Sequence, residues 1–302
     1  MDVRRVADES DCIAWAAIKN EVDPADPVAP DELSRMIERD PEGAWHLAWV
    51  DGGAAGCSVT RRSNSAGLAF AMVRVLPGRR GLGVGSALYA VVSAHAHRLG
   101  LDAIRTRAVA DDEATLRFLA HRGFAEIGRE CEVRLDLAGS RDRGVAGPPE
   151  GVEIVTLGSC LDLAPEAYAL AAETADEIAG AEEYVVPPLP EWRHENIDDA
   201  LPDGSFLALA RGRVVGFAGL NPRGAESGVA EHMLTAVTRG WRRRGVALAL
   251  KSAQIAWARA HGYRELVTYN NEANDPMRAL NAQLGYEPRP VQILFRGPLA
   301  PA

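Results

Sequence analysis

The chain repeats one pattern along its length, and this duplication constrains its fold more than any other feature. An Arg-x-x-Gly-x-small motif and a closing Gly-aromatic pair each occur twice, in the same order. The matched positions are Arg80 with Arg242 and Gly123 with Gly285, each 162 positions apart, and Gly56 with Gly216, 160 positions apart. A period this long predicts a duplicated domain, because solenoid repeats have periods of roughly 20–50 residues.

The length of the chain agrees with two copies of one domain. At about 150 residues per domain, a chain of 302 residues predicts two domains. Residues 139–150 are polar, rich in Gly and Pro, and carry no apolar period, which predicts a linker. We therefore expect one domain at residues 1–138 and a second at residues 151–302.

Both copies predict the same order of elements from their hydrophobic periods and turn residues. After an opening strand, the first copy predicts a helical region (8–40), a strand hairpin (45–60), a strand (67–76), a long helix (84–99), a strand (103–109), a helix (112–122) and a closing strand (126–136). The corresponding ranges in the second copy are 162–200, 205–220, 228–238, 246–261, 264–269, 274–284 and 288–296. Strands that pair antiparallel and then connect through β-α-β units predict an α/β fold with a mixed sheet flanked by helices.

Composition excludes several classes of function. The net charge is −9 and the sequence pI is about 5.4, which disfavours nucleic acid as a partner. There is no run of 18 apolar residues, and the N-terminus lacks an apolar signal segment, so we expect a cytoplasmic protein without a membrane span. The four cysteines show no zinc spacing, so we expect reduced thiols and no metal site.

In each copy, a loop rich in Arg and Gly lies between a predicted strand and a predicted helix. The backbone N–H groups at a helix N-terminus attract anions, and small residues let a phosphate approach the backbone. Arginine adds charge and hydrogen-bond donors that suit phosphate. The residues of these two predicted phosphate sites are Arg80, Gly81, Gly83 and Gly85 in the first copy, and Arg242, Arg244, Gly245, Val246 and Ala247 in the second. The alternative reading is a tight turn with solvated arginines, but its occurrence at matched positions in both copies favours a binding loop.

These loops and the closing elements Phe118–Phe124 and Leu280–Tyr286 resemble the GNAT N-acetyltransferase superfamily, over nearly the whole chain. The resemblance implies two tandem GNAT domains that use acetyl-CoA as acyl donor. It further implies that backbone groups near Thr235 and Val237, with Val73 and Val75 as their counterparts, bind the pantetheine and thioester, and that Asn274 contacts CoA.

The resemblance also distinguishes the two copies. In GNAT members that use a glutamate base, it stands eleven residues before the first Arg of the motif, which is Glu231 in the second copy and Ala69 in the first. Strand alternation turns the neighbouring His232 to the other face and favours a structural role for it. The family's usual tyrosine acid is replaced by Asn281 and Leu119, so the acid stays open, with Tyr269 as one candidate. We expect a catalytic second domain and a first domain that is structural or a CoA site.

The resemblance implies a small-molecule primary amine as acceptor. Five carboxylates within Glu173–Tyr184 would suit a cationic amine, and a solvated helix face is the alternative. Two other functions remain open, which are an acyl-CoA-binding sensor or scaffold without catalysis, and an enzyme similar to mycothiol synthase. The sequence is compatible with a monomer or a homodimer.

Overall fold

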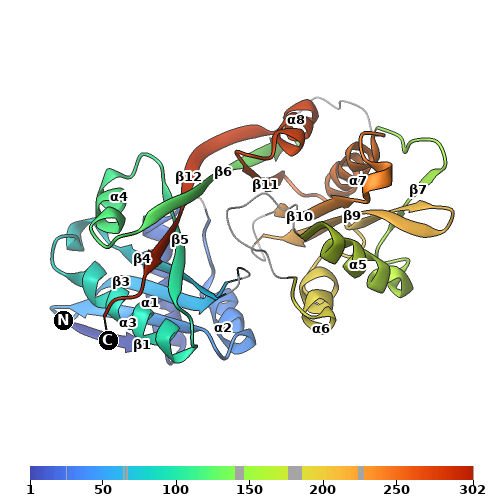
Figure 1. Cartoon of the computed structure of the whole chain (residues 1–302). Helices are drawn as coiled ribbons and strands as arrows, with labels where there is room; N and C mark the ends of the chain where they lie inside the picture. The colour runs from blue at the N-terminus through green and yellow to red at the C-terminus, as the bar shows by residue number, and fades with distance from the viewer. Residues whose placement is uncertain are drawn as a thin grey trace. The chain divides into compact units, whose positions relative to one another are not determined.

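In a computed structural model, the chain forms two compact units (Figure 1). Unit 1 comprises Met1–Gly128 and Gln292–Ala302, and unit 2 comprises Arg129–Val291. The structure describes residues 1–24, 26–63, 65, 67–139, 146–175, 186–223 and 228–301. Over these residues, no helix is both long and apolar enough to cross a bilayer.

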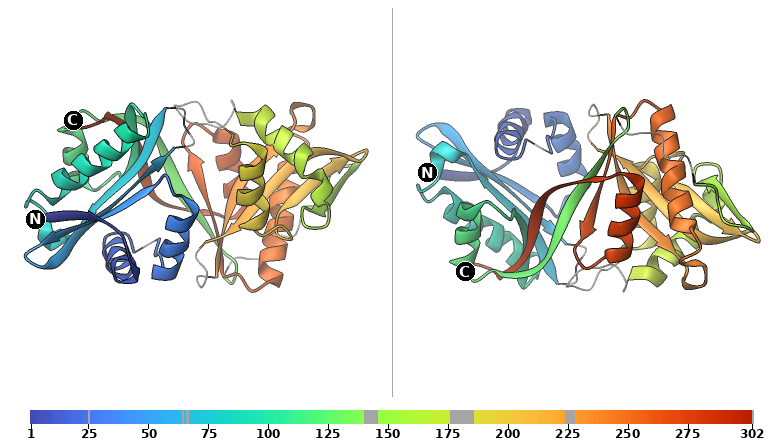
Figure 2. Two further views of the ribbon diagram at one scale, coloured as in Figure 1. Left: turned by 90° about the horizontal axis from the view of Figure 1, so that it is seen from below. Right: turned by 90° about the horizontal axis from the view of Figure 1, so that it is seen from above.

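Unit 1 is a mixed sheet with helices on both faces (Figure 2). Its strands, in their order across the sheet, are β1 (Asp2–Arg5), β2 (Ala44–Val50), β3 (Gly53–Arg62), β4 (Leu68–Val75), β5 (Ala103–Val109) and part of β12 (Glu287–Pro298). Its helices are α1 (Glu9–Val22), α2 (Pro30–Arg39), α3 (Val84–Arg98) and α4 (Glu113–Ala120). Strands β1 to β4 pair antiparallel, whereas β4 and β5 are parallel.

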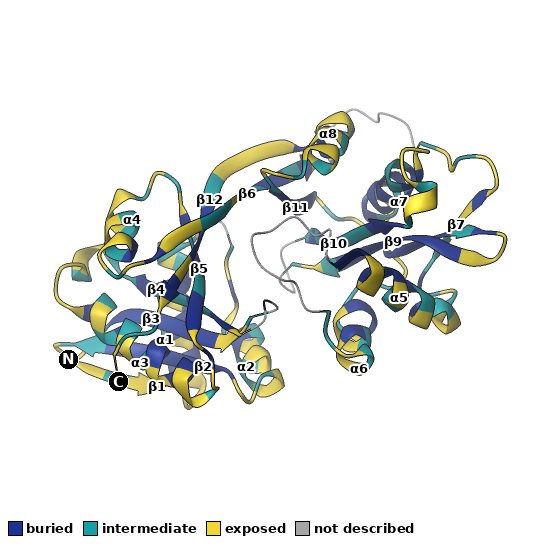
Figure 3. Ribbon diagram, in the orientation of Figure 1, coloured by how far each residue is buried: buried dark blue, intermediate teal, exposed yellow. Residues whose placement is uncertain are grey.

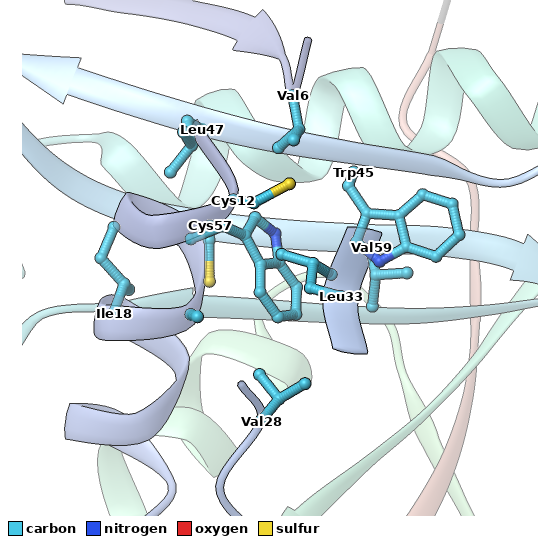
Figure 4. Packing of buried hydrophobic residues seen from close by; sticks show 11 residues of the cluster. Val6, Cys12, Ile18, Val28, Leu33, Trp45, Leu47, Cys57 and Val59 are labelled. Atoms are coloured by element: carbon cyan, nitrogen blue, oxygen red, sulfur yellow. The ribbon is translucent and has the colours of Figure 1, made fainter. Parts of the chain in front are cut away.

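Apolar clusters on both faces of the sheet hold the layers of unit 1 together. Trp15 and Ile18 of α1 pack with Leu33, Trp45 and Leu47 between the helices α1 and α2 and the sheet (Figure 4). On the opposite face, α3 and α4 pack over a second cluster of small and aromatic side chains. Burying these side chains stabilises the unit, at roughly 25 cal/mol per Å² of apolar surface removed from water.

Unit 2 repeats this architecture. Its strands, in their order across the sheet, are β7 (Val152–Thr156), β8 (Phe206–Ala210), β9 (Arg213–Pro222), β10 (Val229–Val237), β11 (Glu265–Asn271) and part of β6 (Ala125–Asp136). Its helices are α5 (Ala164–Thr174), α6 (Leu189–Arg193), α7 (Val246–Ala260) and α8 (Asp275–Leu284). Helix α5 and Trp192 of α6 cover one face of the sheet, and α7 covers the other. The predicted mixed α/β fold is confirmed, and the predicted ranges agree with the elements to within a few residues.

Part of each closing strand pairs with a strand of the other copy. Residues Gln292–Pro298 of β12 pair antiparallel with β5 in unit 1, whereas residues 130–136 of β6 pair antiparallel with β11 in unit 2. The compact units therefore differ from the division at 138 and 151, and most of the predicted linker 139–150 lies outside the described residues. The physical reason is that duplicated strands of similar pattern fit either sheet, so the two copies can exchange them.

Candidate functional site

The phosphate-binding loop predicted in unit 2 lies between β10 and α7. A short 3₁₀ turn, Arg239–Trp241, leads into it, and Gly245 at the N-cap of α7 has a left-handed φ of +87°. No side chain caps α7, so the first N–H groups of the helix, at Val246 and Ala247, point out of its end without an intrahelical partner. Arg242 Nε donates to the carbonyl oxygen of Val237 at 2.9 Å, and the guanidinium of Arg244 lies over the Trp241 ring at 5.0 Å. The loop therefore offers N–H donors and positive charge to an anion.

Unit 1 carries the same loop before α3. Gly83 is the N-cap, with φ of +82°, and Gly81 has φ of +78°. Arg80 Nε points to the carbonyl oxygen of Val75, at 3.4 Å. Gly85 leaves room for the Phe118 ring, because a Cβ at this position would lie 3.0 Å from it. The loop alone therefore does not distinguish the units.

The strand before each loop separates from its parallel neighbour. Strand β10 is paired with β11 only over Val229–Glu231, and then runs on to Val237 along the loop side of the sheet. Strand β4 is likewise paired with β5 only over Leu68–Phe70. Thr235 and Val237, and Val73 and Val75 in unit 1, lie on these diverging segments. Their backbone groups face the gap between the strands, where we expected the thioester to bind.

Only β10 has a bulge in this segment. Its antiparallel register with β9 shifts between His232 and Thr235, so that Met233 and Leu234 oppose the single residue Gly219. The register between β3 and β4 runs from Gly56 to Arg62 without a shift. A bulge redirects side chains and backbone groups and is frequent beside active sites.

The bulge corrects one comparison made from the sequence. Because β10 contains one extra residue, Glu231 does not correspond to Ala69. Ala69 pairs with Ile104 as Ala230 pairs with Leu266, and both alanines are fully buried. The counterpart of Glu231 is therefore Phe70, which also leaves unit 1 without a carboxylate at this place.

Glu231 is half-buried and lies on the sheet face covered by α5 and α6. Its partners across the ladder are Asn221 on β9 and Val267 on β11, so their side chains share that face. Asn221 Nδ2 donates to the Glu195 carbonyl oxygen at 3.2 Å, and its buried Oδ1 has no hydrogen-bond partner among the described residues. Tyr269 follows two residues after Val267 on the same face.

A group of charged side chains lies beside Glu231 on this face. Glu132 of β6 accepts hydrogen bonds from Arg134 at 2.5 Å, from Arg223 at 2.8 Å and from the Tyr269 hydroxyl at 3.0 Å. Burial opposes ionisation of Glu132, but the two arginines outweigh it and hold the pKa of this carboxyl below its ordinary value. Since β6 is encoded in the first copy, sequence comparison within the second copy could not find Glu132 or Arg134.

The other predicted site residues have structural contacts of their own. Asn274 is the N-cap of α8, and its side chain accepts a hydrogen bond from the Met277 N–H at 3.2 Å. Asn281 is buried and donates to Asn270 at 2.7 Å, so it lies on the α8 face and not beside Glu231. His232 is buried on the α7 face, as strand alternation predicted, and hydrogen-bonds Gln254. The acidic segment Glu173–Tyr184 lies outside the described residues from position 176 onward.

A family model described as Acetyltransferase (GNAT) family matches residues 12–124 and 165–286. The chain belongs to the GNAT acetyltransferase family. The two matched regions are the two copies inferred from the repeat, so the tandem arrangement is confirmed as well.

This GNAT protein is similar over nearly its full length to other proteins. A mycothiol acetyltransferase from Thermobispora bispora is 27% identical over 297 residues, covering 96% of each chain. The solved structure of a tandem GNAT protein from the clavulanic acid biosynthesis pathway has a TM-score of 0.82 and 20% identity, with 100% of both chains covered. A GCN5-related N-acetyltransferase from Sphaerobacter thermophilus has a TM-score of 0.79 and 21% identity, covering 100% of this chain and 96% of the other.

Sequence reasoning missed the bulge in this GNAT protein, although the sequence contained a sign of it. The offset between copies grows from 160 at Gly56 and Gly216 to 162 at Val75 and Val237. Two extra residues must therefore lie between the hairpin and the loop of the second copy. The register places one of them in the bulge.

Proposed function

We propose that the chain is an acetyl-CoA-dependent N-acetyltransferase that acts on a primary amine of a small molecule, with unit 2 as the catalytic domain. The observation that supports this most is the order of features along β10. The half-buried carboxylate Glu231, the bulge at Met233–Leu234, the diverging segment to Val237 and the loop Arg242–Gly245 follow one another within fifteen residues.

On the donor side, the N-terminus of α7 and Arg242 and Arg244 would hold the pyrophosphate of acetyl-CoA. The backbone of Thr235 and Val237 would hold the pantetheine arm, since this segment has no β11 partner. A backbone N–H directed at the thioester oxygen would stabilise the negative charge that develops there, by about 3–4 kcal/mol. Acetyl-CoA supplies the acetyl group as a thioester.

On the acceptor side, Glu231 would act as the general base. Its carboxylate accepts a proton from the acceptor ammonium, directly or through one water, which frees the nitrogen lone pair. The nitrogen then attacks the thioester carbonyl carbon and the C–N bond forms. As the C–S bond breaks, the nitrogen loses its second proton to give the neutral amide, and the leaving thiolate takes up that proton to give the free thiol of CoA. The Tyr269 hydroxyl donates a hydrogen bond to Glu132, so it could protonate the leaving thiolate only after that hydrogen bond is broken.

The surroundings of Glu231 favour a cationic acceptor. Among the described residues, Glu231, Glu132 and Glu265 place carboxylates on one face, where Arg134 pairs with Glu132 and Glu265 and Arg223 pairs with Glu132. The unpartnered Oδ1 of Asn221 adds an acceptor for an N–H group next to Glu231. An ammonium group would therefore find both charge and hydrogen-bond acceptors there.

The test is the release of free CoA thiol when the full chain is incubated with acetyl-CoA and a panel of small amines. The panel contains polyamines, amino sugars and aminoglycosides, each with a matched uncharged amide as control. We expect thiol release with at least one cationic amine and none with the amides. Binding of acetyl-CoA without release over the whole panel would contradict the proposal and favour an acyl-CoA-binding sensor.

A second candidate is an acceptor related to mycothiol. The observation that favours it is the similarity, over 96% of both chains, to a mycothiol acetyltransferase. If a mycothiol-type amine is added to the same panel, the ratio of its kcat/KM to that of the other amines separates the two candidates. Unit 1, with its intact loop but Phe70 at the position of Glu231, would be structural or a second CoA site.

A further inference from the structure

The bulge in β10 has a partner on the other face of the sheet. Gln254 of α7 is fully buried, and its Nε2 donates to two carbonyl oxygens of β9, those of Gly219 at 3.0 Å and Ala218 at 3.2 Å. Gly219 is the residue that faces the bulge, and the regular ladder resumes at Ala218. Buried carbonyl groups need a hydrogen-bond partner, and a bulge interrupts the ladder that supplies it. Gln254 provides donors at this interruption.

Two further side chains orient the Gln254 amide. Because its NH₂ group faces the two carbonyl groups, its Oε1 faces His232 Nδ1, 2.9 Å away. His232 Nδ1 must then carry the hydrogen, and the neutral ring accepts through Nε2 from the hydroxyl of Tyr286. The direction of every hydrogen bond in the chain Tyr286–His232–Gln254–β9 is thus determined.

The burial of these side chains favours this one set of hydrogen-bond directions. His232 is 3% exposed and Tyr286 is 6% exposed. Burial, with the positive charge of Lys251, lowers the pKa of His232 well below its ordinary value, so the ring stays neutral with one donor and one acceptor. A buried polar network in which each member is satisfied favours one geometry over others.

Unit 1 is an internal comparison, because it has neither the network nor the bulge. The residue that matches His232 through the strand register is Ala71, and those that match Gln254 and Tyr286 at the 162-residue offset are Val92 and Phe124. All three lie in the apolar core beneath β4. The register of β4 is continuous there. The polar network and the bulge therefore occur together in one unit and are absent together from the described part of the other.

We propose that Gln254 and His232, supported by Tyr286, are positioning residues that hold the β10 bulge, and with it the backbone between Glu231 and Thr235, in the geometry that acyl transfer needs. They lie on the α7 face, opposite to Glu231, and do not touch the acceptor. This inference rests on the proposed function of unit 2 for its kinetic consequences. Its structural part, that the network fixes the bulge, can be tested without activity.

The main variant is Gln254→Leu, which keeps a similar volume and removes the hydrogen bonds. We expect kcat to fall about tenfold to a hundredfold, since a displacement of the reacting groups by about 1 Å costs this much. The KM for acetyl-CoA should change less than about threefold, because the loop at Arg242 is untouched. Amide hydrogen exchange over Ala230–Val237 should become faster. The matched control is Val92→Ala in unit 1, which lowers stability in the apolar counterpart and should leave kcat unchanged.

A second pair of variants separates hydrogen bonding from packing if Gln254→Leu does not fold. His232→Asn keeps an N–H donor toward Gln254, whereas His232→Leu fills the space without one. We expect His232→Asn to retain most of the kcat and His232→Leu to lose it, even if His232→Leu has the higher Tm.

The inference is overturned if Gln254→Leu has wild-type kcat and unchanged exchange, or if His232→Asn and His232→Leu lose kcat equally. If no amine is acetylated by the wild type, the proposed function has failed, and the exchange measurement on Gln254→Leu against Val92→Ala still decides the structural part. Equal amide hydrogen exchange over Ala230–Val237 in Gln254→Leu and Val92→Ala would then overturn the structural part.

Discussion

The two units have the same fold and similar phosphate loops, yet the strands that lead into these loops differ. Strand β10 carries Glu231 and a bulge, and β4 carries Phe70 and a continuous register. Beneath β10 lies the polar chain of His232, Gln254 and Tyr286, where unit 1 has an apolar core. The two units therefore share a loop suited to phosphate and differ in the strand that would carry the proposed base.

Strands β3 and β9 are largely buried in both units (Figure 3), but the face covered by the first helices differs. Ala236 of β10 packs in the apolar core near α5, whereas its counterpart Arg74 is a buried cation paired with Asp23 at 3.2 Å. Lys19 lies in the same region and pairs with Asp26 at 3.2 Å. In unit 1, ion pairs thus occupy a place that is apolar in unit 2. The following predictions test this difference, from the largest expected effect to the smallest.

Replacing Glu231 with Gln should reduce kcat by about 10²- to 10⁴-fold, because the acceptor would lose the proposed general base. The measurement is thiol release at saturating substrates. Glu153→Gln, an exposed carboxylate on β7 of the same unit, is the control and should have wild-type activity. Unchanged turnover in Glu231→Gln, together with its loss in Arg80→Ala, would reverse the assignment of the catalytic unit.

Replacing Lys251 with Met should stabilise the protein, because burial lowers the pKa of this amine to about 7 from the ordinary 10.5. Between pH 7 and pH 10.5 the unfolded chain holds the Lys251 proton more tightly than the folded chain, so the free energy of unfolding of the wild type rises with pH. The destabilisation by the buried ammonium is fully present below pH 7. The gain in the free energy of unfolding of Lys251→Met should be of the order of 2–4 kcal/mol at pH 6. It should vanish as the pH approaches 10.5, the ordinary pKa of lysine. Denaturant unfolding at several pH values measures it.

Lys19→Met is the matched variant in unit 1. Its ammonium has Asp26 at 3.2 Å, whereas the Lys251 ammonium lies over the Tyr286 ring at 5.5 Å. Burial lowers the pKa of Lys19 as well, but Asp26 opposes this shift, and removal of Lys19 leaves that carboxylate without this partner. We therefore expect a smaller gain in stability than in Lys251→Met. A similar gain in both variants would show that the two units do not differ in this respect.

Arg242→Ala should raise the KM for acetyl-CoA about 10- to 100-fold, since a charged hydrogen bond contributes about 1.5–3 kcal/mol. Arg80→Ala makes the same change in unit 1 and should leave this KM unchanged. Steady-state kinetics on both variants gives the comparison directly. A greater effect of Arg80→Ala would place the working donor site in unit 1.

The smallest effect is expected at the left-handed position of the loop. Arg243 has φ of +57°, and its counterpart in unit 1 is Gly81 at +78°. Because a side chain is disfavoured there, Arg243→Gly should stabilise unit 2, and Gly81→Ala should destabilise unit 1, each by about 0.5–1 kcal/mol. Thermal unfolding of the two variants should show Tm shifts of opposite sign.

The elements of the fold could be predicted because local periods determine them. The helices at 84–99 and 246–261 and the strand at 103–109 were each bounded by glycine or by a clear change of period, and they end where predicted to within about a residue. Glu231 and the loop residues could be located because their spacing along one strand is local too.

The rest depended on interactions distant in sequence. Nothing in the alternation of Val133 and Leu135 says that β6 pairs with β11, because the strand would fit the other sheet equally well. Consequently Glu132 and Arg134 were not expected near Glu231. The bulge changed which residue in β4 matches Glu231, and its support from Gln254 could not be recognised before α7 was placed beneath β10.

The exchange of closing strands also bears on how the chain matures on the ribosome. The edge of β5 that faces away from β4 pairs with residues Gln292–Pro298, which come more than 160 residues after Gly128, where the first segment of unit 1 ends. At a synthesis rate of roughly 5–20 residues per second, that edge stays uncovered for about 10–30 s after the rest of the first unit has emerged. Uncovered edges invite pairing between nascent chains, so premature termination shortly before residue 292 should release a protein with an aggregation-prone first half.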